Sequence, residues 1–222
     1  MEKVLKHQGI PENTAPSEKI IEVFNTSREH FRRLGEPRGI WVEISKEAFA
    51  EVYRGEGHND STTPVADIFP YAGKLALFAV TLGEAVSLKI NSLMAEYDFA
   101  GGSMLDSVAS EGAELAADYL QESFMNDYLK KANPGSEIKI LRYSPGYCGW
   151  HISGQKKLFG YLNPEKIKMS FNDRYLMSPL KSITGVMIAA RKEKHYFEMI
   201  YPCCGSCRTP SCRERLTELE RE

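Results

Sequence analysis

The feature that most constrains the fold is a change of pattern at Asn133-Pro134-Gly135. Before this triplet, apolar residues recur at helical spacing, and after it they alternate as they do in strands. Proline and glycine both interrupt regular structure, so the triplet marks a junction. A helical part followed by a strand-rich part predicts an α+β fold, with a twisted, mainly antiparallel sheet flanked by helices.

The chain is long enough for one domain with a real core. It has 222 residues, of which 42% are hydrophobic and 26% are charged, as in ordinary globular proteins. We interpret residues 1–222 as a single domain. Its parts are a mostly helical segment (1–135), a strand-rich segment (136–200) and a cysteine-rich tail (201–222).

Three helices are expected in the first part. One begins at Ser17 and ends before Gly35, and a second covers roughly 72–96. The clearest helix starts at Ser103, after a break at Gly101-Gly102, and runs to about 131. Its predicted buried face consists of Leu105, Val108, Ala109, Gly112, Leu115, Ala116, Tyr119 and Leu120. Most of these side chains are small, so we expect another element to pack closely against the helix.

Strands are expected on both sides of the junction. The segments with alternating or β-branched character are 40–44, 138–143, 185–190 and 195–200. The last two flank a charged hairpin turn at 191–194. A short helix is expected at 154–162, and a polar loop at 55–64.

Charge and hydropathy exclude two classes of partner. The formal charge is −2, which gives no global attraction for nucleic acid or an anionic membrane. The most apolar stretch, 75–88, is too short to span a bilayer and contains Glu84. The first residues contain no apolar run typical of a signal peptide, so a cytoplasmic protein is expected.

Four of the five cysteines lie in the ten residues 203–212. In a reducing compartment they are not expected to form structural disulfides. The Cys204-x-x-Cys207 pair followed by Cys212 predicts ligands for zinc or an iron–sulfur cluster. Cys203, Cys148 or an outside group can supply a fourth ligand, and Cys203 is the weakest candidate. A labile disulfide or free thiols are the alternatives.

The stretch RYSPGYCGWHISGQ at 142–155 concentrates polar and aromatic groups. Arg142 at a strand end, followed by a glycine turn with free backbone N–H groups, suits a carboxylate or another anion. Tyr147 and Trp150 offer flat surfaces for a ring. The alternative is an ordinary turn with a solvated arginine and two core aromatics. For Cys148 and His151, structural roles are favoured over catalytic ones.

The same stretch is similar to a known family. RYSPGY resembles the R-x-x-x-G-Y signature of the S-adenosylmethionine-binding activation domain of cobalamin-dependent methionine synthase. MSPLKSITG at 177–185 resembles that domain's P-x-x-S-x-S-G stretch, with Thr184 in place of the second serine. Tyr196-Phe197 falls about where the family has a tyrosine pair. These three features match in order and spacing across 142–197, whereas the N-terminal half is similar only loosely.

The resemblance implies a C-shaped α+β fold that binds S-adenosylmethionine in a shallow groove. It implies that Arg142 pairs with the methionine carboxylate of the ligand. The other implied binding residues are Ser144, Pro145, Gly146, Tyr147 and Tyr196. The implied role is reductive methylation, and hence reactivation, of cob(II)alamin. The protein positions an already activated methyl donor, so no catalytic triad is required.

The chain has no D-x-H-x-x-G cobalamin motif, so the cobalamin must belong to another protein. The resemblance therefore implies a stand-alone reactivation component rather than a complete enzyme. Its partner would be a B12-dependent methionine synthase that lacks its own activation domain, with an electron donor such as flavodoxin or ferredoxin. The alternative function is a metal- or iron–sulfur-binding adaptor, or a reactivator for another corrinoid methyltransferase.

Two departures from the family pattern concern the binding site. The family has P-x-C-P-x-H after its Gly-Tyr pair, whereas this chain has Cys148-Gly-Trp-His151, so the rim of the groove is expected to differ. The family also uses an acidic residue from its N-terminal part. Asp67 and Glu43 are equal candidates for that role.

Overall fold

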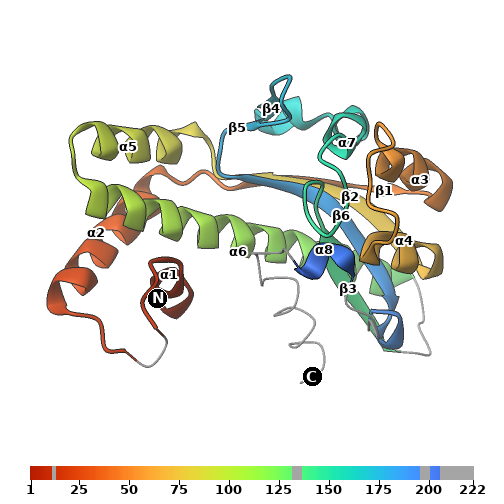
Figure 1. Ribbon diagram of the computed structural model, residues 1–222, viewed down its shortest axis with the longest axis horizontal. Coiled ribbons are helices and arrows are strands. Elements are labelled where there is room, and N and C mark those ends of the chain that lie inside the picture. Colours follow the sequence, from red (N-terminus) through yellow and green to blue (C-terminus); the bar gives the residue numbers. More distant parts are fainter. Residues whose placement is uncertain (12–13, 132–136, 196–200, 206–222) are drawn as a thin grey trace. The chain divides into compact units, whose positions relative to one another are not determined.

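The computed structural model describes residues 1–11, 14–131, 137–195 and 201–205 (Figure 1). The chain divides into two compact units. Unit 1 comprises Met1–Gly39, Val80–Asp118 and Pro164–Ile183, and unit 2 comprises Ile40–Ala79, Tyr119–Asn163 and Thr184–Glu222. Each unit is built from three separate segments of sequence.

The described residues form helices, short 3₁₀ turns and strands. The α-helices are α1 (Glu2–His7), α2 (Glu18–Leu34), α3 (Lys46–Arg54), α4 (Pro64–Ile68), α5 (Glu84–Ala95), α6 (Phe99–Lys131), α7 (Gly154–Leu162) and α8 (Pro202–Gly205). The 3₁₀ turns are η1 (Phe69–Tyr71), η2 (Pro164–Ile167) and η3 (Lys192–Lys194). The strands are β1 (Arg38–Ile44), β2 (Lys74–Thr81), β3 (Ile138–Tyr143), β4 (Ser170–Phe171), β5 (Met177–Ser178) and β6 (Ser182–Arg191).

The main sheet has the strand order β1-β2-β6-β3. Strands β3 and β6 are antiparallel, with Ile138 opposite Arg191 and Tyr143 opposite Val186. Strands β4 and β5 form a separate antiparallel pair. These elements confirm the expected α+β class, and the strands expected at 40–44, 138–143 and 185–190 are present, as is the helix at 154–162.

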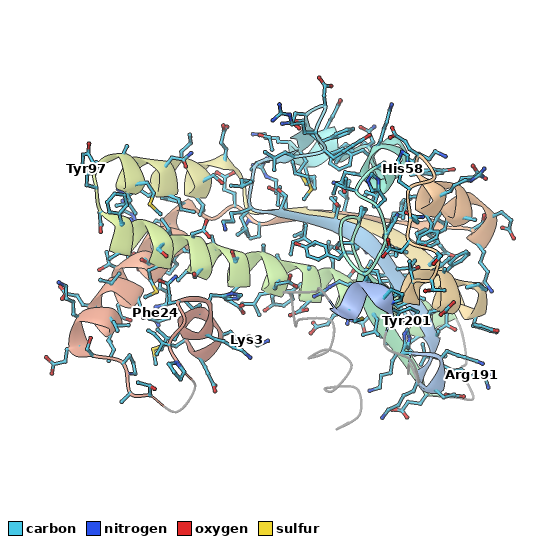
Figure 2. All side chains as sticks on the ribbon, in the orientation of Figure 1. Lys3, Phe24, His58, Tyr97, Arg191 and Tyr201 are labelled. Carbon is cyan, nitrogen blue, oxygen red and sulfur yellow. The ribbon has the colours of Figure 1, made fainter. Side chains whose placement is uncertain are left out.

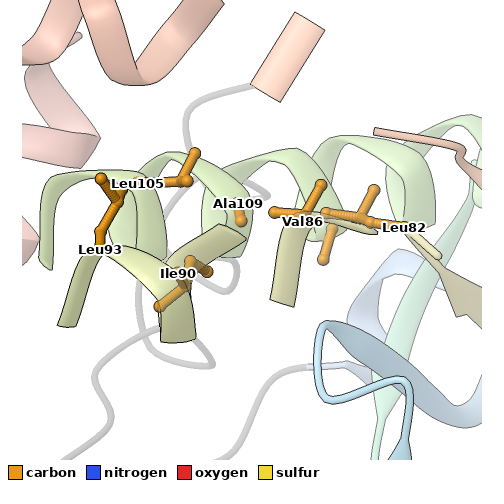
Figure 3. Close-up of a cluster of buried hydrophobic side chains, with 7 residues drawn as sticks. Leu82, Val86, Ile90, Leu93, Leu105 and Ala109 are labelled. Carbon is orange, nitrogen blue, oxygen red and sulfur yellow. The ribbon is translucent and has the colours of Figure 1, made fainter. Parts of the chain in front are cut away.

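Unit 1 is organised around α2, α5 and the first part of α6. Ser17 caps α2 by accepting the N–H of Ile20, which fixes the predicted start of this helix. Apolar side chains of α5 and α6 face each other in one cluster (Figure 3). That cluster consists of Leu82, Val86, Ile90, Leu93, Leu105, Ala109 and Ala113. Its burial holds the two helices together.

The N-terminal segment belongs to the core of unit 1. Val4 and Leu5 of α1 are buried in one cluster with Phe24 of α2 (Figure 2). The Gln8 amide, just after α1, donates to the Ser107 hydroxyl of α6 at 2.6 Å. Apolar burial and this hydrogen bond both attach α1 to α6.

The helix expected at 72–96 is present only in its second half, and the prediction is wrong for its first half. Residues Lys74–Thr81 form β2, and α5 begins only at Glu84. Gly83 lies between them with φ +80°, a conformation that ends the strand and that most side chains disfavour. Almost every side chain of β2 is buried, so its sequence is continuously apolar and lacks the alternation that identifies a half-buried strand.

Helix α6 begins earlier than expected. It starts at Phe99, where the Asp98 carboxylate accepts the N–H of Gly101 at 2.9 Å. Gly101-Gly102 therefore lies inside the first turns instead of breaking the chain. Leu115 and Tyr119, expected on the buried face, are exposed, whereas Ala113, Ala117 and Phe124 are buried. The start and the second half of the predicted face are corrected accordingly.

The prediction of close packing against α6 is confirmed at Gly112. A Cβ placed there would overlap the ring of Phe31 from α2. We expect Gly112→Ala to lower the free energy of unfolding by about 1–3 kcal/mol, measured by urea denaturation. Because the overlap is with one ring, the double variant Gly112→Ala, Phe31→Leu should recover part of that loss. Purely additive losses would show that the ring is not the cause.

Unit 2 contains most of the main sheet together with α3, α4 and α7. Helices α3 and α7 pack against each other. The Trp150 ring packs against the rings of Phe49 and Tyr53 from α3. In both pairs the ring centroids are 5.8 Å apart. This aromatic cluster anchors the segment that follows β3.

The hairpin expected around 191–194 can be compared with the structure only in part. The turn expected at 191–194 contains η3. The strand expected at 195–200 falls almost wholly outside the described residues, so it stays a prediction. No helix among the described residues is long and apolar enough to cross a membrane.

Candidate functional site

Arg142 is buried in β3. It lies opposite Met187 of β6, and only 5% of its surface is exposed. The alternative of a solvated arginine is therefore wrong. A buried guanidinium is costly unless it meets acceptors or charge, so this position has a specific role in the fold, in binding, or in both.

The turn after Arg142 is closed by its own backbone. The Gly146 N–H donates to the Trp150 carbonyl at 2.7 Å, and the Tyr147 N–H donates to the Ser144 carbonyl at 3.2 Å. Gly146 has φ +91°, so glycine is required there. The expectation that this turn offers free N–H groups is wrong for these two residues. Tyr147 is 54% exposed and presents its ring to solvent.

The segment Cys148–His151 turns back into unit 2. Cys148 and Gly149 both have positive φ, at +52° and +73°. This reversal carries Trp150 into the core, where it is 1% exposed. The Trp150 ring thus anchors this segment in the core, and Tyr147 presents the exposed ring on this loop.

A polar loop at 55–63 holds that segment in place. The Asp60 N–H donates to the Gly149 carbonyl at 2.9 Å. The Asn59 side chain accepts the His151 N–H at 2.8 Å, and the Glu56 N–H donates to the Ser153 hydroxyl at 3.2 Å. His58 of the same loop, labelled in Figure 2, stands edge-on to the His151 ring.

His151 has a structural arrangement. Its Nδ1 lies 2.9 Å from the Ser153 hydroxyl and 3.2 Å from the Ser153 N–H. Within the described part of the chain, no group of three or more histidine, cysteine or acidic side chains is arranged to hold a metal ion. The ring therefore helps to shape the turn that leads into α7.

The two sequence motifs meet at one end of the β3–β6 pair. Tyr143 lies opposite Val186, so the RYSPGY turn leaves β3 beside Thr184 and Gly185. A Cβ at Gly185 would overlap the Tyr143 carbonyl. The Thr184 hydroxyl donates to the Gln155 side chain of α7 at 2.9 Å, with both residues buried. The second motif thus packs directly against the first.

Asp67 and Glu43 have different surroundings. Asp67 accepts the Tyr201 hydroxyl at 2.7 Å, and Glu43 pairs with Lys74 at 2.9 Å. Burial, together with the Asp67 carboxylate, raises the pKa of Tyr201. Both acids are engaged within unit 2, and neither is thereby selected as a ligand contact.

Cys203 and Cys204 lie in α8, the short helix that follows Tyr201 (Figure 1). Burial raises the pKa of Cys203 to about 11, with help from the adjacent Cys204 thiol and the Asp60 carboxylate. Cys207, Cys212 and Tyr196 lie outside the described residues.

Burial of His195 makes the folding stability of unit 2 depend on pH. It is 1% exposed, its Nε2 lies 3.0 Å from the Lys139 carbonyl, and burial lowers its pKa. His195 therefore binds a proton more readily in the unfolded chain than in the folded protein. The stability that the neutral, buried ring contributes is complete above about pH 6.5 and is lost as the pH falls. We expect urea denaturation to show lower stability at pH 5.5 than at pH 7.5. His195→Gln should reduce that difference, and an unchanged difference would contradict the assignment.

The sequence profile of one family matches residues 59–201, from the polar loop to the tyrosine before α8. The family is described as vitamin B12 dependent methionine synthase, activation domain. The chain belongs to this family. The match includes both motifs at the end of the β3–β6 pair and stops just before the cysteines of the tail. No curated protein matches the sequence significantly.

The fold also matches a solved member of this activation-domain class. The structure described as the MetH reactivation domain bound to AdoHcy aligns with a TM-score of 0.59 and 17% identity. The alignment covers 99% of this chain and 83% of the other. At this identity the likeness shows a shared fold, and it extends over both units of this activation-domain protein.

Sequence reasoning missed two parts of the site. The first is the loop 55–63, whose contacts to 149–153 link segments about 90 residues apart. The second is Gln155, which bonds to Thr184 across the same site. The clustering of His58, Asn59 and Asp60 in a glycine-flanked loop was the only available signal, and it fits an ordinary surface loop equally well.

Proposed function

We propose that this protein binds S-adenosylmethionine and supports reductive methylation of cob(II)alamin on a separate B12-dependent methionine synthase. Membership of the activation-domain family supports this role, as does the shared fold with a reactivation domain that binds AdoHcy. The cobalamin belongs to the partner, in the cytoplasm, and an electron donor such as flavodoxin or ferredoxin supplies the reducing equivalent.

The observation that carries the proposal is the placement of Arg142. A buried cation at the end of β3, next to a tightly closed turn, suits the carboxylate of an amino-acid ligand. Tyr147, exposed on that turn, presents a ring that can lie against the ligand. Ser144, Pro145, Gly146 and Tyr196 complete the proposed binding set.

Chemically, the proposed task is positioning rather than acid–base catalysis. The sulfonium of S-adenosylmethionine is already activated as a methyl donor. This chain adds the fixed guanidinium of Arg142, which pairs with the carboxylate of the ligand, and a rigid turn. Together they limit the orientations of the methyl group. The turn is held by its own backbone hydrogen bonds, and the segment that follows it is held by the loop 55–63, which supports the proposed rigidity.

Calorimetric titration of the wild-type protein with S-adenosylmethionine tests the proposed binding. We expect saturable binding with one site per chain and competition by S-adenosylhomocysteine. A protein that is folded by circular dichroism but binds neither compound would overturn the proposal.

We also propose that Cys204, Cys207 and Cys212 bind zinc or an iron–sulfur cluster. The CxxC spacing supports this, and α8 places Cys204 at the surface of unit 2, where it is partly exposed. Such a centre would favour the alternative role, an adaptor or reactivator for another corrinoid methyltransferase.

Metal analysis of anaerobically purified protein tests the cysteine centre. We expect bound zinc or iron in the wild type and its loss in Cys207→Ser, whereas Cys148→Ser should retain the metal unless Cys148 is the fourth ligand. Metal-free wild-type protein with freely titrating thiols would rule the centre out.

A further inference from the structure

We infer that Gln155 and Trp150 form a second recognition point for the S-adenosyl ligand, where buried neutral N–H groups bind acceptor nitrogens of the adenine ring. The inference rests on the proposed function, because it assigns residues to one part of the proposed ligand. Gln155 lies outside both family motifs, and Trp150 lies in the segment 148–151, where this chain departs from the family pattern.

The first donor is the Gln155 side-chain amide. Gln155 is 1% exposed, and its Oε1 accepts the Thr184 hydroxyl at 2.9 Å. This bond fixes which way the amide faces. Its Nε2 is buried and has no hydrogen-bond partner among the residues that the structure describes. The Gln155 amide is thus held in place through its oxygen, and its N–H groups remain for an acceptor on a ligand.

The second donor is the Trp150 indole. Trp150 is also 1% exposed, and its Nε1–H has no partner in the described part of the chain. Gly154, one residue before Gln155, lies against this nitrogen, and a Cβ there would overlap it. Glycine at this position thus lets the start of α7 pack directly against the edge of the indole that carries this N–H.

Both donors lie close to the signature turn. Thr184, which orients Gln155, precedes Gly185, and a Cβ at Gly185 would overlap the carbonyl of Tyr143. Tyr143 in turn follows Arg142 directly. The Trp150 carbonyl accepts the Gly146 N–H at 2.7 Å. A ligand held by Arg142 and this turn would lie near the first turn of α7.

The chemistry of the donors selects the part of the ligand. Leaving a buried N–H unsatisfied costs about 1–3 kcal/mol, which a ligand acceptor would recover. Both donors are uncharged, so they match an uncharged acceptor better than a carboxylate, for which Arg142 is available. The adenine ring presents acceptor nitrogens in its plane, and amide donors commonly bind them.

The test compares S-adenosylhomocysteine with deaza analogues, in which one ring nitrogen is replaced by C–H. In the wild-type protein, at least one analogue should bind about tenfold more weakly, corresponding to one lost hydrogen bond. This comparison needs no substitution and so does not depend on how a variant folds. Equal binding of all the analogues would overturn the inference while leaving the proposed function intact.

Gln155→Met, which keeps the side-chain length but removes the donor, completes the test. We expect about tenfold weaker binding of S-adenosylhomocysteine and loss of discrimination against the sensitive analogue. Gln121→Met on α6 is the control and should change neither. A Gln155→Met protein with a lower melting temperature but unchanged affinity and discrimination would show that the amide is structural only. Absence of any binding by the wild type would overturn the proposed function itself.

Discussion

Gly185→Ala is expected to destabilise the protein by about 3 kcal/mol or more. A Cβ at this position would overlap the Tyr143 carbonyl and approach the Phe78 ring to 3.0 Å. The carbonyl belongs to β3, which is paired with β6, so neither strand can shift without breaking the register between them. Forced overlap in a packed region is among the few mechanisms that give losses of this size.

Urea denaturation monitored by circular dichroism measures this loss. Gly160→Ala is the matched control, because Gly160 lies within α7 and a Cβ there would meet nothing within 4 Å. That control should gain about 0.5–1 kcal/mol from helix propensity. If Gly185→Ala is as stable as the wild type, the described contact between the two motifs is incorrect.

The second large effect is expected at Arg142. Replacing it with methionine removes the guanidinium that we propose pairs with the carboxylate of the ligand. This should weaken S-adenosylmethionine binding by about 2–3 kcal/mol, or roughly 30- to 150-fold. Arg142→Lys should recover only part of this loss, because an ammonium lacks the planar fork of a guanidinium.

Two controls separate binding from folding at this buried position. Arg174→Met removes an exposed arginine between β4 and β5 and should leave the affinity unchanged. Melting temperatures should accompany every titration, since Arg142 is only 5% exposed and contributes to the core. A folded Arg142→Met protein with wild-type affinity would remove Arg142 from the binding site.

Local signals in the sequence predict part of this fold well. Ser17 marks the start of α2, alternation identifies β3, and the small residue Gly112 indicates close packing on α6. Each of these features depends on neighbouring residues or on one face of one element, which a single sequence displays directly.

Features that depend on tertiary structure were missed or misplaced. Strand β2 is buried on both faces, so its sequence is as apolar as a buried helix. Asp98 rather than Ser103 caps α6, although both are acceptable capping residues.

The candidate site shows the same limit. The motif at 142–147 is visible in the sequence, but the burial of Arg142 and the bond between Thr184 and Gln155 arise only when distant strands and helices meet. Cys148 and His151 look more reactive in the sequence than their neighbours. In the structure they lie in the turn that carries Trp150 into the core.

The central claim is that this chain reactivates a corrinoid protein in trans with S-adenosylmethionine. The direct measurement mixes it with a B12-dependent methionine synthase that lacks an activation domain, a chemical reductant and S-adenosylmethionine. Absorbance should show cob(II)alamin converting to methylcobalamin only when this protein is present, and much more slowly with Arg142→Met. Conversion at the same rate without the protein, or none with the folded wild type, would contradict the account.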